Sequence, residues 1–176
     1  DVRLGGNIGI PILSLEPGTN ETIYIVEISS FQIELTENIK PEIAVLLNIS
    51  EDHLDRHSSI KEYRDIKSKI FKNQNIDNFS LISNEDEQTN FVSKMDFVSK
   101  KIILKKSKNL DDKNYYFKNL NIIRRILKIL NVPDISIERG IKNFKGLSHR
   151  MELVCQNDKI KFINDSKATN ASATNM

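Results

Sequence analysis

The stretch EIAVLLNISEDHLDRH (residues 42–57) places an almost unbroken apolar run directly before a dense group of ionisable side chains. The apolar part has the length of one strand, and its lack of polar alternation predicts that both faces are covered. A second run of this kind, TIYIVEIS (residues 22–29), precedes it. Strands of this type alternating with helical patterns predict an α/β fold with a mostly parallel sheet and crossover helices.

Further strands follow these two. FSLISN (residues 79–84) predicts a third strand, and residues 95–99 and 101–106 are weaker candidates. The segment MELVCQNDKIKFIND (residues 151–165) predicts a hairpin with Asn157-Asp158 in its turn. We expect a domain boundary at residues 145–149, just before this hairpin.

Apolar residues at helical spacing predict the helices, whose starts and ends carry capping residues and a proline. The predicted ranges are 58–73, 119–131 and 135–143. Polar segments rich in lysine and asparagine at residues 84–94 and 105–114 are interpreted as surface connections.

The composition narrows the classes of function. The chain has 26 basic and 24 acidic residues, which gives no strong electrostatic footprint for nucleic acid. Cys155 is the one cysteine, so the chain has no internal disulfide and no CxxC metal site, which fits a reducing, cytoplasmic setting. No apolar run approaches the roughly 20 residues that span a bilayer, and no signal peptide opens the chain. Both ends read as cuts through a longer protein.

Two strand ends carry candidate ligands. Glu27 interrupts an apolar run near the carboxyl end of its strand, where open α/β sheets bind their ligands. His53 follows the end of the next strand, so we expect both residues on one rim of the sheet. The structural alternatives are a strand-end Glu27 that reaches solvent and an ordinary solvated charged loop around His53.

Lys67 projects into an apolar stripe of the helix predicted over residues 58–73. At about 100° per residue, the stripe consists of Ile60, Tyr63, Ile66, Ile70 and Phe71. The other lysines of this helix, Lys61, Lys69 and Lys72, project to the opposite side. An inward lysine is rare unless it is paired or modified, which makes Lys67 a functional candidate. A snorkelling side chain at the edge of the stripe is the alternative.

Three further segments contain residues suited to anions. The turn GGNIGIP (residues 5–11) can offer backbone N–H groups to an anion, although it also fits an ordinary glycine-rich turn. Arg150 and the segment NDSKATN (residues 164–170) suit phosphate and ribose hydroxyls. A helix cap at Asp165 or Ser166 is the structural alternative. No GxxxxGK[ST] phosphate loop occurs in the chain.

Six motifs occur here in the order seen in one family. They are GGNIGIP, EISSFQIE, NISEDHLDRH, EYRDIKSKIF, LSHRMELV and INDSKATN. Together they resemble the Mur ligases, and the SSFQ and SHRME…NDSKATN versions are most similar to the branch that adds D-glutamate. The resemblance implies an ATP- and Mg²⁺-dependent ligase of peptidoglycan synthesis. Such an enzyme joins D-glutamate to UDP-N-acetylmuramoyl-L-alanine through an acyl phosphate.

The resemblance also implies a domain division. Residues 1–146 would form the central ATP-binding domain without its phosphate loop. Residues 147–176 would begin a Rossmann-like C-terminal domain with its first hairpin. We expect the chain alone to be inactive, and the full-length enzyme to be a monomer with no nucleic-acid partner and no membrane insertion.

Residue roles follow from the same resemblance. Catalytic and magnesium-binding roles fall on Glu27, His53 and Lys67, the last as a carbamylated lysine. Contacts with ATP fall on Asn119, Arg150 and Asp165. Contacts with the substrates fall on Asn7, Ser29, Gln32, Lys167 and Thr169. The chain departs from the family at Tyr115 and Tyr116, where an HNxxN motif has His and Asn, so only Asn119 is carried over.

Two other functions stay open at this point. One is another Mur ligase or an enzyme similar to folylpolyglutamate synthetase. The other, from a different class, is a non-catalytic nucleotide- or RNA-binding domain that uses the lysines. Retention on RNA that survives moderate salt would favour the second, because weak nonspecific binding falls steeply with salt.

Overall fold

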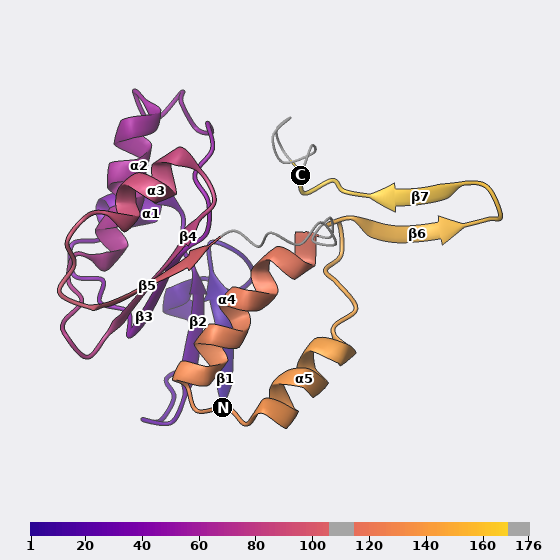
Figure 1. Cartoon of the computed structure of the whole chain (residues 1–176), viewed down its shortest axis with the longest axis horizontal. Coiled ribbons are helices and arrows are strands. Elements are labelled where there is room, and N and C mark those ends of the chain that lie inside the picture. The colour runs from indigo at the N-terminus through magenta and orange to yellow at the C-terminus, as the bar shows by residue number, and fades with distance from the viewer. Residues whose placement is uncertain (106–114, 169–176) are drawn as a thin grey trace.

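The computed structural model of the protein describes residues 1–105 and 115–168 (Figure 1). Within these ranges the strands form three sheets. The first sheet pairs β1 (Val2–Gly6) with β2 (Ile23–Glu27) in parallel. The second contains the parallel strands β3 (Ile43–Leu46), β4 (Phe79–Asn84) and β5 (Lys100–Lys105). The third is an antiparallel hairpin of β6 (Glu152–Gln156) and β7 (Lys161–Asn164). The predicted α/β fold with parallel strands is confirmed.

Helices connect the parallel strands. The α-helices are α1 (Ser30–Leu35), α2 (Ile60–Ser68), α3 (Glu87–Ser93), α4 (Tyr115–Ile129) and α5 (Asp134–Asn143). Short 3₁₀ turns, η1 (Ile12–Ser14) and η2 (Lys69–Phe71), follow β1 and α2. Figure 1 shows α1, α2 and α3 grouped beside the sheet β3–β4–β5, whereas α4 and α5 pack against each other in another part of the molecule. None of the helices in the described ranges is long and apolar enough to cross a membrane.

The main core lies between the sheet β3–β4–β5 and the helices α2 and α3. Its buried members are Ala44, Leu46, Ile49, Tyr63, Phe71, Ile82 and Val92. They bring together side chains from both strands and helices, and removing this apolar surface from water is the main favourable contribution to folding. β4 is the most buried strand, because Leu81 and Ile82 on its opposite faces are both fully covered. The second sheet is therefore a firm support for the loops at its carboxyl end.

β2 differs from this pattern. The apolar run at residues 22–29 predicts a strand covered on both faces, but every residue of β2 is exposed. Within the described residues β2 pairs only with β1, and the core helices pack on the other sheet. The prediction of two covered faces is therefore wrong for β2 in this structure. In β3 one face is buried at Ala44 and Leu46, and the other face, with Ile43 and Val45, is half-buried.

Most predicted elements are present with shifted ends. The strand predicted at residues 79–84 matches β4, and the one at 101–106 is β5, which begins one residue earlier. The helix predicted over 58–73 begins after the capping residue Ser59 as α2 and ends as η2. The hairpin is confirmed, with its turn at residues 157–160. The strand predicted at 95–99 is wrong, because these residues form the turn between α3 and β5.

Two helices were not predicted, α1 and α3. Each is short and begins with a reciprocal capping box, formed by Ser29 with Gln32 and by Asp86 with Thr89. In such a box the side chain of each partner bonds the backbone of the other, which satisfies two free N–H groups at the helix start. Local hydrogen bonding rather than apolar periodicity therefore specifies these helices.

Candidate functional site

The turn after β1 lies against the end of β2. Gly6 pairs with Glu27 in the sheet, and the Asn7 backbone N–H donates to the Glu27 carbonyl oxygen at 2.8 Å. Gly6 has a φ of 122°, and a Cβ there would lie 2.1 Å from that same oxygen. Only glycine fits at this position. The glycine-rich turn therefore places Asn7 next to Glu27 at the carboxyl end of the sheet.

Ser29 and Gln32 form the cap of α1, immediately after Glu27. The Gln32 backbone N–H donates to Ser29 Oγ at 3.3 Å, and the Ser29 N–H donates to Gln32 Oε1 at 2.9 Å. Both side chains thus have a local structural role, and the contact with substrate stays a prediction. The cap fixes the direction in which the chain leaves β2.

A tight turn follows β3 and exposes His53. His53 has a left-handed backbone with a φ of 54°, and its carbonyl oxygen accepts from the N–H groups of Arg56 and His57 at 3.0 and 2.9 Å. The His53 N–H donates to Asp52 Oδ1 at 2.9 Å. This arrangement leaves the His53 side chain exposed and turns His57 inward, where it is buried.

Aromatic contacts join this turn to α1 and α2. The ring of Phe31, on α1, lies with its centroid 5.2 Å from that of His53 and 5.5 Å from that of His57. The ring of Tyr63, on α2, lies 5.2 Å from His57 and 6.2 Å from His53. Edge-to-face and tilted contacts at these distances are favourable. Helix α1, which follows β2, therefore meets the turn and helix α2, which both follow β3.

Lys67 lies on the same side of α2 as Tyr63. Its Nζ lies 4.9 Å from the centre of the Tyr63 ring, in cation–π geometry. Lys67 is half-buried, whereas Lys61, Lys69 and Lys72 are exposed, in agreement with the predicted inward direction. Burial also raises the pKa of the Tyr63 hydroxyl to about 12, with a contribution from Asp52, so this side chain stays a neutral phenol.

The charge of Lys67 is influenced by two carboxylates. Burial lowers the pKa of Lys67, and the negative charges of Glu27 and Asp52 act in the opposite direction. The end of β2 and the turn after β3 are therefore both within electrostatic reach of this amine. We call Glu27, Asp52, His53, Tyr63 and Lys67, with the supporting rings of Phe31 and His57, the strand-end cluster.

The donors of the strand-end cluster suit an open magnesium site. Among the described residues, no group of three or more His, Cys, Asp or Glu side chains is placed to enclose a metal ion. Mg²⁺ in phosphate-transfer sites is usually held by only one or two carboxylates, with waters and substrate phosphates completing its shell. Glu27 at the end of β2 and Asp52 in the turn after β3 are carboxylates of the type this requirement calls for.

A second set of candidates meets at the open end of the hairpin. The Met151 N–H donates to Asp165 Oδ1 at 3.1 Å, and the Lys167 N–H donates to the His149 carbonyl oxygen at 3.1 Å. We call His149, Arg150, Asp165 and Lys167 the hairpin mouth. The structure brings its three predicted residues, Arg150, Asp165 and Lys167, to one end of a hairpin that projects away from the second sheet (Figure 1).

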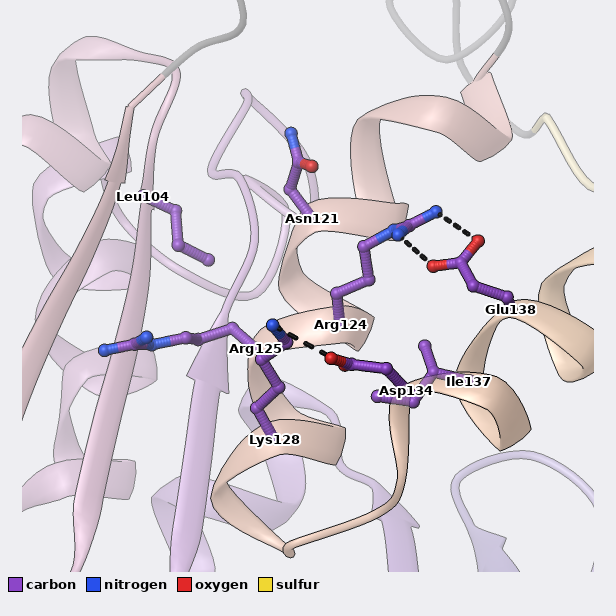
Figure 2. Close-up of a pocket in the computed structure, with 8 residues that line it drawn as sticks. All are labelled: Leu104, Asn121, Arg124, Arg125, Lys128, Asp134, Ile137 and Glu138. Carbon is purple, nitrogen blue, oxygen red and sulfur yellow. Dashed lines mark hydrogen bonds and ion pairs between the residues drawn. The ribbon is translucent and has the colours of Figure 1, made fainter.

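Two other predicted residues lie elsewhere. Asn119 is half-buried on α4, and Thr169 falls outside the described residues. α4 also borders a cavity of about 420 Å³ between β5, α4 and α5. Figure 2 shows the ion pairs of Arg124 with Glu138 and Lys128 with Asp134 at its side. No residue predicted for the site lines this cavity within the described part of the chain.

Several members of the strand-end cluster were not predicted as site residues. Tyr63 was predicted only as part of the apolar stripe, and Phe31 and Asp52 were assigned no role. His57 was noted in its motif but likewise assigned none. No local pattern in the sequence marks these residues, because a spacing of four in a turn does not decide which side chain points inward. Their meeting depends on contacts between distant segments.

The fold agrees with the comparison to known families. Residues 4–144 match the Mur ligase middle domain, and the chain therefore belongs to the Mur ligase family. A solved structure similar to the chain is the crystal structure of MurF from Acinetobacter baumannii. Its TM-score is 0.70 at 13% identity over 99% of this chain and 52% of that one, which supports the fold.

Among curated proteins, the chain is similar to ligases named UDP-N-acetylmuramoylalanine–D-glutamate ligase. The one from Sphingopyxis alaskensis is 35% identical over 98% of this chain and 42% of its own length. The one from Zymomonas mobilis is 32% identical over 97% and 41%, and the one from Clostridioides difficile is 31% identical over 99% and 45%. The chain thus spans less than half the length of these relatives.

Proposed function

We propose that the chain is the central part of an ATP-dependent ligase that adds D-glutamate to UDP-N-acetylmuramoyl-L-alanine. The observation that carries the proposal is the strand-end cluster, in which Glu27 and Asp52 act on the half-buried Lys67 beside the exposed His53. Membership of the Mur ligase family and the names of the relatives support the choice of substrates. The proposal places the enzyme in the cytoplasm as a monomer.

The proposal divides the chain into two parts. Residues 1–146 belong to the central ATP-binding domain, and residues 147–176 begin the C-terminal domain. Two exposed apolar surfaces support this division. Every residue of β2 is exposed, and Leu153 and Phe162 of the hairpin are each 53% exposed. Apolar surface of this extent is normally covered, so we infer that further segments of a longer protein pack on both surfaces.

The proposed reaction needs a site that stabilises charge on a transferring phosphoryl group. The substrate carboxylate attacks the γ-phosphorus of ATP, and ADP leaves as the acyl phosphate forms. The amine of D-glutamate then attacks the acyl carbon, the amide bond forms, and inorganic phosphate leaves. Bound Mg²⁺ supplies neutralisation of the developing negative charge. In this proposal Glu27, His53 and a modified Lys67 hold the ion.

Lys67 is suited to modification by carbon dioxide. Burial lowers the pKa of its amine, so more of it is neutral than for an ordinary lysine. The neutral amine adds to CO₂, a C–N bond forms, and one amine proton leaves to solvent. The resulting carbamate is an anion with two oxygen donors, and such donors are the type that Mg²⁺ prefers. Cation–π contact with Tyr63 positions the unmodified side chain toward the cluster.

The remaining predicted residues take binding roles. Asn119, Arg150 and Asp165 contact ATP. Asn7, Ser29, Gln32, Lys167 and Thr169 lie along the path of the two other substrates. The backbone contact between Asn7 and Glu27 supports a substrate position next to the metal site.

The test is a phosphate-release assay on the full-length protein that contains this chain. We expect release that requires ATP, Mg²⁺, UDP-N-acetylmuramoyl-L-alanine and D-glutamate together, with a ligated product of the corresponding mass. Residues 1–176 alone should be inactive, because no GxxxxGK[ST] loop lies within them. Preference for another amino acid or another acceptor would assign a different ligase. If the full-length protein catalyses no nucleotide-dependent ligation with any of these acceptors, the proposal is disproved.

A further inference from the structure

His57 is a buried polar residue for which the ligase reaction has no assigned use. Its side chain is 1% exposed, and its Nε2 lies 3.0 Å from Oγ of Ser30, which is 2% exposed. Its Nδ1 is buried with no hydrogen-bond partner. A buried polar atom without a hydrogen-bond partner destabilises the folded protein. If packing were the whole role of this side chain, an apolar ring would therefore give a more stable fold.

The hydrogen bond joins the two segments that carry the candidate magnesium ligands. Ser30 is the first residue of α1 and follows Glu27 by three positions, while His57 follows His53 by four. The bond thus links the chain just after β2 to the turn just after β3. These two strands belong to different sheets within the described residues, so no strand pairing there holds Glu27 and His53 in register.

The turn also needs an external anchor because its backbone is strained. His53 has a φ of 54°, and a left-handed conformation costs about 1–2 kcal/mol for a residue other than glycine. Such a conformation persists only where the surroundings hold it. On one side the Ile49 N–H donates to Asp86 Oδ2 at 3.0 Å. On the other side the buried His57 ring contacts the rings of Phe31 and Tyr63 and hydrogen-bonds Ser30.

We propose that His57 is a positioning residue: through Ser30 it fixes the turn that carries His53 relative to the strand that carries Glu27. This inference rests on the proposed function for its catalytic consequence. His57 does not touch substrate or the reacting atoms in this role. It sets the distance between two groups that must act on one phosphoryl group, and a small error in such a distance lowers the rate of the chemical step.

The experiment uses four variants of the full-length protein. His57→Phe keeps an aromatic ring of similar size and removes the hydrogen bond, whereas His57→Gln keeps an amide that can reach Ser30. Ser30→Ala removes the partner with little change in volume. Ser99→Ala is the matched control, because Ser99 is a buried serine whose hydroxyl bonds Ser80, in the interior between β4 and β5 and away from the cluster.

Two readouts are measured on each variant. The first is kcat and KM for the ligase reaction. For His57→Phe and Ser30→Ala we expect kcat to fall about 10- to 100-fold, as for other residues that orient a metal ligand, with KM for the UDP substrate nearly unchanged. His57→Gln should recover much of the loss. Ser99→Ala should lower the melting temperature and leave kcat unchanged.

The second readout is amide hydrogen exchange, which does not depend on activity. The peptide covering residues 53–57 includes the Arg56 and His57 amides that donate to His53. After correction for the intrinsic rate of each sequence, we expect its exchange to be about tenfold faster in His57→Phe and Ser30→Ala. Ser99→Ala should not change it.

The outcomes separate this inference from the proposed function. Unchanged exchange in both anchor variants would overturn the inference, as would faster exchange with a normal kcat. Failure of His57→Gln to recover any activity would also count against it. A wild-type protein without ligase activity would disprove the proposed function, and the exchange data would still decide whether His57 anchors the turn.

Discussion

The strand-end cluster and the hairpin mouth hold their candidate residues in different ways. In the cluster, His57 and Tyr63 are buried and in ring contact, and the Lys67 Nζ lies over the Tyr63 ring. In the hairpin mouth, the backbone is fixed by Asp165 and His149, but Lys167 is exposed and both strands beyond it expose apolar side chains.

The cluster is thus held by side-chain packing, whereas the hairpin mouth is held by hydrogen bonds to the main chain. The cluster obtains its geometry from contacts made within the described residues, so its side chains are preorganised. The hairpin mouth has a defined backbone, but its Lys167 side chain is exposed. We therefore expect changes in the cluster to act on the chemical step and changes in the hairpin mouth to act on binding.

Lys67 should give the largest effect. Lys67→Ala should lower the activity of the full-length enzyme by about 100- to 1,000-fold or more, because it removes a proposed ligand of the ion that neutralises the developing negative charge. Lys67→Arg should also fail, because a fixed cation cannot replace a carbamate. Short carboxylic acids added to Lys67→Ala should restore part of the rate. Steady-state phosphate release measures each effect.

The control for this prediction is on the same helix. Lys61 is exposed on the opposite side of α2, and Lys61→Ala should be nearly neutral. A Lys67→Arg enzyme with close to normal turnover would refute the carbamate assignment. It would return Lys67 to the role of a snorkelling side chain and would remove the main distinction between the two regions.

His53 should give the next largest effect. The side chain is exposed at the rim of the cluster, so its removal should not disturb the core. We expect His53→Ala to lower kcat about 100-fold while KM for the UDP substrate changes little, since a ligand of the metal acts on the reacting centre. Separate measurement of kcat and KM tests this prediction. A rise in KM with a normal kcat would show that His53 acts in substrate binding and not in the chemical step.

How far the sequence predicts this molecule depends on the range of the contacts involved. β4 was predicted to its ends because a short apolar run bounded by polar residues is a local signal. The inward direction of Lys67 also follows from helical spacing within one element. In contrast, α1 and α3 have no clear apolar periodicity and are marked only by their capping boxes, so the sequence pattern does not predict them.

The candidate site shows the same limit. Glu27, His53 and Lys67 stand out in the sequence because each breaks a local pattern, although their chemical roles stay predictions. Ser30 and His57 break none, and they are 27 positions apart. Only the folded chain brings them together. The exposure of β2 was missed for a related reason: an apolar strand predicts a covering layer, but not which part of the chain supplies it.

Arg150 should give a moderate effect on binding. In the hairpin mouth its predicted partner is a phosphate of ATP, and a charge-assisted hydrogen bond contributes about 1.5–3 kcal/mol. We therefore expect Arg150→Ala to raise KM for ATP by roughly 10- to 100-fold, with a smaller change in kcat. Lys159→Ala, at the exposed turn of the same hairpin, is the control. A loss confined to kcat would contradict the division between the two regions.

The smallest expected effect is a pH dependence of stability that originates at Lys67. Burial lowers the pKa of this amine in the folded protein. Between the lowered pKa and the ordinary value, the unfolded chain holds a proton at Lys67 that the folded chain has released. Stability therefore rises with pH across that interval and is lost as the pH falls through it. Urea unfolding of the full-length protein at a series of alkaline pH values, in CO₂-free buffer, measures the rise.

Two leucine variants isolate the contribution of Lys67 from all other titrating groups. Lys67→Leu should flatten the pH dependence relative to the wild type, because it removes the proton that folding displaces. Lys167→Leu should leave the dependence unchanged, because this lysine is exposed in the hairpin mouth. If both variants flatten the profile equally, or neither does, Lys67 is no more desolvated than a surface lysine. The cluster would then lack the preorganised amine that its proposed carbamylation requires.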